Sequence, residues 1–321
     1  MLITVLLFLL GFLCLIKGGD WFVDGATGIA RRFHLPDLLI GATVVSIGTT
    51  LPEVMISTEA AFQGNAGISY GNAIGSVICN TCLIAAATIA VKPGQASRKS
   101  LTLPTVFFFL SASLYTVIAA ARGVFVRLHG VLFLVLFLAY LLTIILQMKK
   151  DPEATDAEEP AAKNLPLWKE LLRLVVGAAL IAAGADLLIN NGTVIARAIG
   201  VPDSVIGLTI IALGTSLPEL ITAITASAKG HSALGLGNVI GANFLNIALV
   251  SGAAITISPF AIPAEKTLAG INSSLIVDIP LMIVSMILLC IPALFKEKLE
   301  RWQGILLLIL YGVFTAYQFF L

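Results

Sequence analysis

The sequence predicts an all-α integral membrane fold of ten transmembrane helices, arranged as two inverted five-helix repeats. First, 58% of the residues are hydrophobic and only 12% are charged, whereas soluble domains contain roughly 25% charged residues. Second, the mean hydropathy of +1.01 is typical of a polytopic membrane protein. Third, one apolar segment occurs twice, as IGATVVSIGTTLPEV (Ile40–Val54) and IGLTIIALGTSLPEL (Ile206–Leu220). The offset, from Ile40 to Ile206, is 166 residues.

Apolar runs and their breaks predict helices of membrane length in chain order. The first run has neither a basic start nor a small-residue cleavage site, so we expect a membrane helix and not a removed signal peptide. The predicted spans are 2–30, 36–62, 66–90, 101–121, 124–148, 169–196, 202–228, 232–257, 272–294 and 302–320. The polar stretch 149–164 is too short to bury a core of its own. We therefore predict a first repeat over 1–148, a cytoplasmic linker over 149–168 and a second repeat over 169–321.

The charges of the connecting segments predict the orientation. Five helices per repeat is an odd number, so equivalent helices must run in opposite directions. If the N-terminus is outside, fourteen Lys and Arg residues lie in cytoplasmic segments and four, Arg122, Arg127, Arg197 and Lys266, lie outside. This positive-inside bias predicts that both termini are outside the cytoplasmic membrane. Inverted repeats with a site at their interface are common in secondary transporters.

The centre of each repeated segment carries an acid beside a helix-breaking proline, in GTTLPE (Gly48–Glu53) and GTSLPE (Gly214–Glu219). Proline has no N–H and clashes with the carbonyl four residues earlier, so each helix is expected to kink at mid-membrane. Free backbone oxygens at that depth are tolerated only where they line a cavity or find a partner. A carboxylate inside an apolar span is costly and indicates function. Two identically placed glutamates predict one site built from both repeats.

The donor set of these segments favours a hard cation. Thr49, Thr50 and Glu53, with their counterparts Thr215, Ser216 and Glu219, all supply oxygen, and no histidine pair lies nearby. Ca²⁺, Mg²⁺ and Na⁺ prefer such ligands, whereas zinc and copper usually recruit Cys or His. Two carboxylates match one divalent or two monovalent cations, and protons are expected to compete for them.

A second duplicated motif follows, as GNAIGSVICN (Gly71–Asn80) and GNVIGANFLN (Gly237–Asn246). Its paired glycines lie four residues apart and predict close approach of another helix. Asn80 and Asn246 could each supply an oxygen ligand or make an interhelical hydrogen bond, and their duplication favours the ligand role. The duplicated Asp20 and Asp186 have no hydroxyl cluster beside them, so a structural pairing is favoured for these acids.

These two motifs in tandem resemble the α-repeats of the cation/Ca²⁺ exchanger superfamily, and in particular prokaryotic sodium/calcium exchanger-like proteins. The resemblance covers nearly the whole chain. It implies a secondary active antiporter that exchanges Ca²⁺ for Na⁺ by alternating access. The first and sixth helices would slide against the other eight. It implies no resident cofactor, with transported Ca²⁺ and Na⁺ as the ligands, and the absent cytoplasmic sensing loop implies no Ca²⁺ regulation of that kind.

The resemblance also implies roles for individual residues. Glu53 and Glu219 would bind Ca²⁺ directly, beside the backbone carbonyls of Thr49 and Thr215. The Na⁺ sites would draw on Thr49, Thr50, Ser76, Asn80, Thr215, Ser216 and Asn246, and on the carbonyls of Ser46 and Ala212. Some members of the family carry Asp in place of Asn246 and Ser in place of Ala242, and Ser46 replaces a common Ala. These departures bear on the number of bound Na⁺ ions and on the coupling ion.

Other functions fit the sequence less well. An antiporter coupled to H⁺ or K⁺ would keep the same architecture. A passive cation channel is usually built by several subunits around one axis, which a pseudo-twofold site in one chain does not match. An enzyme is disfavoured because no nucleophile dyad, phosphate-binding loop or aspartyl-protease motif is found. A net charge of +1 gives no indication of a nucleic-acid partner, and we expect a functional monomer within the lipid bilayer.

Overall fold

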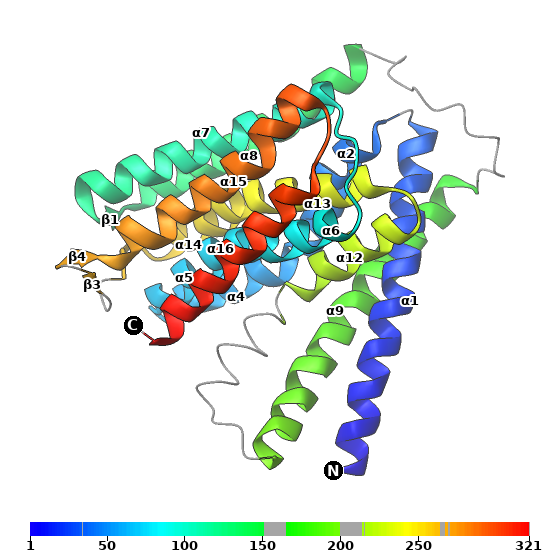
Figure 1. Ribbon diagram of the computed structural model, residues 1–321, viewed down its shortest axis with the longest axis horizontal. Coiled ribbons are helices and arrows are strands. Elements are labelled where there is room, and N and C mark those ends of the chain that lie inside the picture. Colours follow the sequence, from blue (N-terminus) through cyan, green and yellow to red (C-terminus); the bar gives the residue numbers. More distant parts are fainter. Residues whose placement is uncertain are drawn as a thin grey trace.

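The computed structural model describes residues 1–33, 35–150, 165–199, 214, 216–263, 267–268 and 270–320, and these are mostly helical (Figure 1). In the predicted first repeat the elements, with π-helical turns labelled η, are α1 (Leu2–Arg32), α2 (Asp37–Ile40), η1 (Gly41–Val45), α3 (Ser46–Thr49), α4 (Leu51–Phe62), α5 (Ala66–Cys79), η2 (Asn80–Ala85), α6 (Ala86–Val91), α7 (Arg98–Arg122), β1 (Val124–Phe125) and α8 (Arg127–Lys150). In the second they are α9 (Leu167–Ala198), α12 (Leu217–Ala228), α13 (Ser232–Leu245), η4 (Asn246–Val250), α14 (Ser251–Ile257), β2 (Phe260–Ala261), β3 (Thr267–Leu268), β4 (Ile271–Asn272), η5 (Ser274–Asp278), α15 (Ile279–Lys296) and α16 (Arg301–Phe320).

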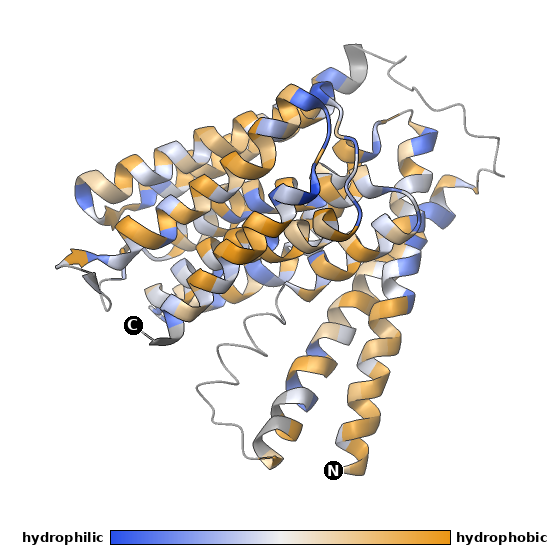
Figure 2. Cartoon of the chain, viewed as in Figure 1, coloured by the Kyte–Doolittle hydropathy of each residue, from blue (hydrophilic) through white to orange (hydrophobic). Residues whose placement is uncertain are grey.

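The all-α membrane class predicted from the sequence is confirmed, and the described helices follow the order of the predicted spans. Seven of them are long and apolar enough to cross a membrane, and the bent pair formed by Asp37–Thr49 and Leu51–Phe62 brings the number to eight. The predicted span 202–228 is described as a helix only over α12, which is shorter. Most of the predicted linker lies outside the described residues. Figure 2, coloured by residue hydropathy, shows hydrophobic colour along much of the outer helices and hydrophilic colour mainly near helix ends and loops, as expected for helices in contact with lipid.

Helices α1 and α9 pack side by side at the edge of the bundle, at a clear angle to most other helices (Figure 1). Their contact is lined by glycines. A Cβ atom at Gly18 would lie 2.9 Å from the carbonyl oxygen of Gly177, and one at Gly11 would lie 3.0 Å from that of Gly184. The residue numbers of these pairs run in opposite directions, so the helices are antiparallel. Glycines spaced seven residues apart allow the two backbones to approach this closely.

Short glycine turns join each glutamate-bearing helix to the next helix. Gly64 follows α4 with φ of 72°, and its repeat counterpart Gly230 follows α12 with φ of 88°. Only glycine adopts this left-handed conformation without steric cost, and it is common just after a helix end. The turns fold α5 back on α4 and α13 back on α12. The duplicated glycines therefore give both repeats the same helical hairpin around the predicted site.

Two short pairings connect the repeats at equivalent places. Residue Gln95, after α6, bridges Lys298 between α15 and α16. Its counterpart at the 166-residue offset is Ala261, in β2, which pairs with Val124 in β1, between α7 and α8. In each case a loop of one repeat pairs with the last interhelical loop of the other. The contacts thus follow the duplication read from the sequence.

The α15–α16 loop is organised around one surface acid. Glu300 accepts hydrogen bonds from the side chains of Lys296 and Trp302, each at 2.7 Å. These donors, together with the nearby charge of Lys298, lower the pKa of Glu300 to about 2. The loop thereby keeps its shape at the start of α16, where it meets Gln95 of the first repeat.

Candidate functional site

The helix that carries Glu53 is broken at Thr50. The axis bends by 44° between Asp37–Thr49 and Leu51–Phe62, and Pro52 lies in the first turn of α4. Proline is tolerated there because the first N–H groups of a helix have no partner within the helix. In the second repeat Ser216, the counterpart of Thr50, likewise precedes a helix with proline in its first turn. The predicted break at these prolines is confirmed in the first repeat, and the second shows the same helix start.

The two glutamates lie in the first turns of α4 and α12, and both side chains are fully buried. None of their four carboxylate oxygens has a hydrogen-bond partner within the described part of the chain. Glu53 lies close enough to Glu219 for their charges to interact. Burying an unpaired carboxylate costs several kcal/mol (about 3–5 when a buried ion pair loses one partner). A bound cation would remove that cost at both residues together.

The duplicated asparagines begin π-helical turns that the sequence analysis missed. Asn80 opens η2 and Asn246 opens η4, and both side chains are fully buried with no hydrogen-bond partner among the described residues. Helix α4 packs against η4, and α12 packs against η2. Each glutamate helix therefore meets the π-helical turn of the other repeat. Single π turns inside α-helices are frequent at functional sites, and the signal available in the sequence was the duplicated asparagine itself.

The hydroxyl-bearing candidates are also buried. Thr50 and Ser216 each hold a hydroxyl without a hydrogen-bond partner in the described ranges. Ser76 is 5% exposed. Thr49 donates to the amide oxygen of Asn238 at 3.1 Å. The carbonyl oxygen of Ser46 accepts the N–H of Thr50 at 2.9 Å and also lies 3.4 Å from the hydroxyl of Thr49.

Two predicted site residues, Thr215 and Ala212, lie outside the described residues. Six of the eleven predicted positions lie on the broken helix α3–α4 or at the start of α12: Ser46, Thr49, Thr50, Glu53, Ser216 and Glu219. Three more lie on the facing elements α5, η2 and η4: Ser76, Asn80 and Asn246. The contacts of α12 with α3, and of each glutamate helix with the opposite π-helical turn, bring both motifs of both repeats to one region.

The predicted close approach at the paired glycines holds in the second repeat. A Cβ atom at Gly241 would lie 2.6 Å from the Cα of Ala42, and Gly237 meets the backbone of Leu38. A Cβ at Gly71 or Gly75 would meet no described residue within 4 Å. On the described residues, the predicted contact at these first-repeat glycines is therefore not found.

Asparagines Asn72 and Asn238 were missed as functional candidates, although they occupy equivalent positions in the second motif. Asn72 donates from Nδ2 to the carbonyl oxygen of Glu53 at 3.0 Å and to the hydroxyl of Ser57 at 2.8 Å. Asn238 instead contacts Thr49 of the other repeat. Each asparagine therefore makes a hydrogen bond to a residue of the predicted site, Glu53 or Thr49. The sequence signal that could have identified them was their exact duplication beside the glycines.

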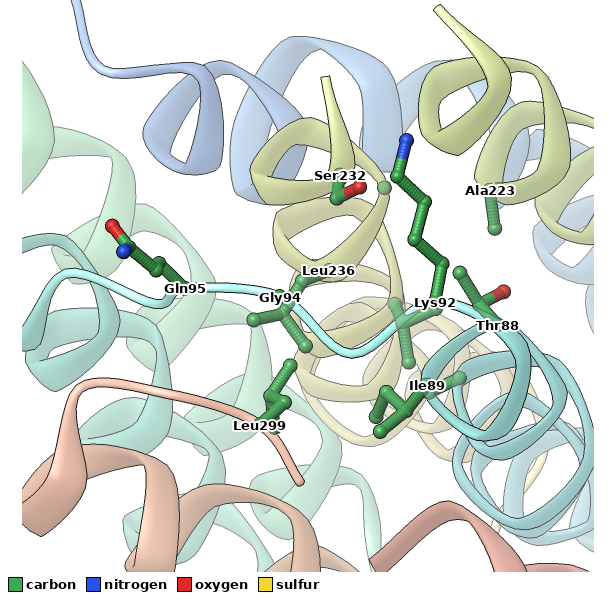
Figure 3. Close-up of a pocket in the computed structure, with 12 residues that line it drawn as sticks. Thr88, Ile89, Lys92, Gly94, Gln95, Ala223, Ser232, Leu236 and Leu299 are labelled. Atoms are coloured by element: carbon green, nitrogen blue, oxygen red, sulfur yellow. The ribbon is translucent and has the colours of Figure 1, made fainter. Parts of the chain in front are cut away.

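A small cavity of about 20 Å³ lies beside α12 and α13, toward the α6–α7 loop. It is lined mainly by apolar side chains, including Ile89 and Leu236, with Lys92 at its edge (Figure 3). Lys92 donates to the carbonyl oxygen of Ser227 at 2.8 Å, near the end of α12. The cavity holds none of the predicted ligands and has room for about one water molecule.

The donor atoms gathered here are of the kind that hard cations prefer. Within the described ranges, no three His, Cys, Asp or Glu side chains come together, and the further buried donors in those ranges are amide, hydroxyl and carbonyl oxygens. Carboxylate and neutral oxygens together are what Ca²⁺ takes in proteins. Both carboxylates also lie in the first turn of a helix, where the helix dipole favours negative charge.

Comparisons with known proteins give consistent matches over most of the chain. A family model described as "Sodium/calcium exchanger protein" matches residues 3–146 and 169–320. The sodium/calcium exchanger MaX1 of Methanosarcina acetivorans is 30% identical over 99% of both chains. The inner membrane protein YrbG of Escherichia coli is 35% identical over 81% of both chains. A solved structure of the sodium-calcium exchanger NCX_Mj, soaked with Na⁺ and Sr²⁺, aligns with a TM-score of 0.81 and 32% identity over 98% of both chains.

Proposed function

Because the chain belongs to the sodium/calcium exchanger protein family, we propose that it is a secondary active antiporter that exchanges Ca²⁺ for Na⁺ by alternating access. The family consists of membrane ion exchangers, and the proposed activity is transport without a chemical step. The relatives named as sodium/calcium exchangers support these two ions. The proposed location is the cytoplasmic membrane, with both termini outside.

The observation that carries this proposal is the pair of buried glutamates. Glu53 and Glu219 come from different repeats and interact electrostatically, and their oxygens have no hydrogen-bond partner among the described residues. Two negative charges are matched by one Ca²⁺ or by two Na⁺. The same oxygens can therefore hold either ion, and competition between them is the basis of exchange.

The neighbouring oxygens supply the remaining ligands in this proposal. The backbone carbonyl of Thr49 and that of Thr215 complete the Ca²⁺ site beside the glutamates. Na⁺ ions draw on Thr50, Ser76, Asn80, Ser216 and Asn246, on the side chains of Thr49 and Thr215, and on the carbonyls of Ser46 and Ala212. Support comes from the buried, unpartnered oxygens of Thr50, Ser216, Asn80 and Asn246.

The moving part in this proposal is the α1–α9 pair. The glycines Gly11, Gly18, Gly177 and Gly184 bring the backbones of these two helices into close contact, which holds them together as a pair. The pair also lies at the edge of the bundle, where it packs on α12. Such a pair can shift as a unit and open the site alternately to either side, with small shear between packed helices.

The test is ⁴⁵Ca²⁺ flux in proteoliposomes with clamped membrane potential. Uptake driven by an outward Na⁺ gradient is expected, and the Glu53→Gln/Glu219→Gln double variant is the inactive control. Uptake driven by a pH gradient without Na⁺, or by a K⁺ gradient alone, would replace Na⁺ with that coupling ion. Flux that needs no counter-ion would indicate a passive channel and would overturn the antiporter proposal.

A further inference from the structure

The equivalent asparagines Asn72 and Asn238 make different hydrogen bonds. Asn72 bonds within its own repeat, to Glu53 and Ser57. The amide oxygen of Asn238 accepts the hydroxyl of Thr49, which belongs to the first repeat, at 3.1 Å. The amide nitrogen of Asn238 has no partner in the described part of the chain. The asparagine of the first repeat therefore bonds within that repeat, whereas the asparagine of the second repeat bonds to a residue of the first.

The sequence explains why Asn238 lacks the bonds that Asn72 makes. The counterpart of Ser57 at the 166-residue offset is Ala223, which has no hydroxyl to accept from Asn238. The α13 backbone is also pressed against the first repeat, because Gly237 and Gly241 contact the backbones of Leu38 and Ala42. These contacts flank Asn238 on its helix and hold it beside the broken helix that carries Thr49.

The hydrogen bond between Thr49 and Asn238 determines whether the lone pairs of the Thr49 hydroxyl can face a cation. A threonine hydroxyl has one hydrogen and two lone pairs. Asn238 accepts that hydrogen at 3.1 Å, closer than the carbonyl oxygen of Ser46 at 3.4 Å, and the same hydroxyl also interacts with the carboxylate of Glu219. With the hydrogen directed at Asn238, the lone pairs of Thr49 are free for a metal ion. Both Thr49 and Asn238 are buried, so water does not compete strongly for the bond.

We propose that Asn238 is a positioning residue of the cation site, which orients the hydroxyl of Thr49 across the repeat interface so that its lone pairs face the transported ion. This inference rests on the proposed function. It makes the second repeat responsible for the geometry of a ligand in the first repeat. Asn72 has no such role, because its bonds remain within the α4–α5 hairpin.

A double-mutant cycle on the full-length protein tests the proposal. The variants are Asn238→Leu, Thr49→Val and their combination, and the readouts are the Na⁺ concentration that half-maximally inhibits ⁴⁵Ca²⁺ binding and the Ca²⁺-induced shift in melting temperature. Loss of one buried hydrogen bond is worth about a threefold to tenfold change in an equilibrium constant. We expect Asn238→Leu to raise the half-inhibitory Na⁺ concentration by that factor, and to have no further effect when valine replaces Thr49.

Two further variants separate positioning from general damage. Asn238→Asp keeps an acceptor for the Thr49 hydroxyl, so we expect it to raise the half-inhibitory Na⁺ concentration less than Asn238→Leu does. Asn72→Leu is the matched change in the other repeat and should combine additively with Thr49→Val. Equal effects of Asn238→Leu in both backgrounds would overturn the positioning role. A wild-type protein whose melting temperature does not respond to any cation would instead reject the proposed function, and the positioning of a cation ligand with it.

Discussion

The two helical hairpins around the site carry the same ligand motifs but are held together differently. In the first repeat, polar bonds join α4 to α5: Ser57 accepts from Asn72 at its hydroxyl, and its carbonyl oxygen accepts from Ser69 at 2.7 Å. In the second repeat Ala223 and Gly235 occupy the positions of Ser57 and Ser69. A Cβ at Gly235 would lie 3.2 Å from the Cα of Ala223, so α12 and α13 meet by direct backbone packing.

The two copies of the motif are therefore stabilised by different interactions with the residues around them. The polar hairpin satisfies its asparagine internally. The close-packed hairpin leaves Asn238 available to the other repeat and borders the small apolar cavity of Figure 3, which Ala223 and Gly235 line. One half is thus held by hydrogen bonds and the other by van der Waals contact. The site itself, which both halves share, is where they are expected to behave alike.

The largest expected effect tests whether the two repeats contribute equally to the site. Glu53→Gln and Glu219→Gln should each weaken Ca²⁺ binding on the order of a hundredfold or more, because an unmatched buried charge costs about 3–5 kcal/mol. The two losses should be similar, since both carboxylates serve one ion. Isothermal titration with Ca²⁺ measures them. A variant that keeps wild-type affinity would show that its glutamate is not a ligand and that the halves are not equivalent.

The sequence predicted the membrane fold, and it singled out the buried glutamates of the candidate site, because both depend on local, duplicated signals. Apolar runs are long enough to identify spans without tertiary information. The glutamates stand out because an acid at mid-membrane has few structural explanations. Their burial and proximity agree with the predicted pairing. The individual ligand roles remain predictions.

Features that depend on packing between distant segments could not be predicted. The π-helical turns at Asn80 and Asn246 arise in otherwise regular apolar runs. The cross-repeat bond of Asn238 needs knowledge that Gly237 and Gly241 seat α13 on the first repeat. Single-sequence patterns do not reveal which helix meets which. The seven-residue spacing of Gly11, Gly18 and Gly25 was visible, but its partner helix was not.

A second, smaller effect separates the two kinds of hairpin. Ser57→Ala removes an acceptor from Asn72 and should lower stability by about 1–2 kcal/mol, because a buried polar group then loses a partner. The melting temperature should fall by a few degrees in thermal scans of detergent-solubilised protein. The reciprocal change, Ala223→Ser, adds the hydroxyl to a hairpin that does not depend on one and should alter the melting temperature less. Equal responses would mean that hydrogen bonding does not distinguish the repeats.

The smallest expected effect concerns a further difference between the repeats, the ion pairing of α1 with the end of α12. Lys229, at the end of α12, lies 2.7 Å from a carboxylate oxygen of Asp24 and 3.3 Å from one of Asp20. This confirms the structural pairing predicted for Asp20. Its duplicate Asp186 instead accepts a hydrogen bond from Asn190 on the same helix. The counterpart of Lys229 in the first repeat is Gln63, which bonds to Glu59.

Lys229→Gln gives the second repeat the residue that the first already has, and it should loosen α1 from α12. The three side chains are partly exposed, at 27%, 40% and 44%, so the loss of stability should be at most about 1 kcal/mol. Hydrogen exchange should rise in the part of α1 around Asp24, with little change in α9. The difference between variant and wild type should shrink in high salt, because salt screens exposed ion pairs. If exchange is unchanged, the ion pair does not hold α1, and the contact of α1 with α12 depends on packing alone, such as that of Gly19 against Ile221.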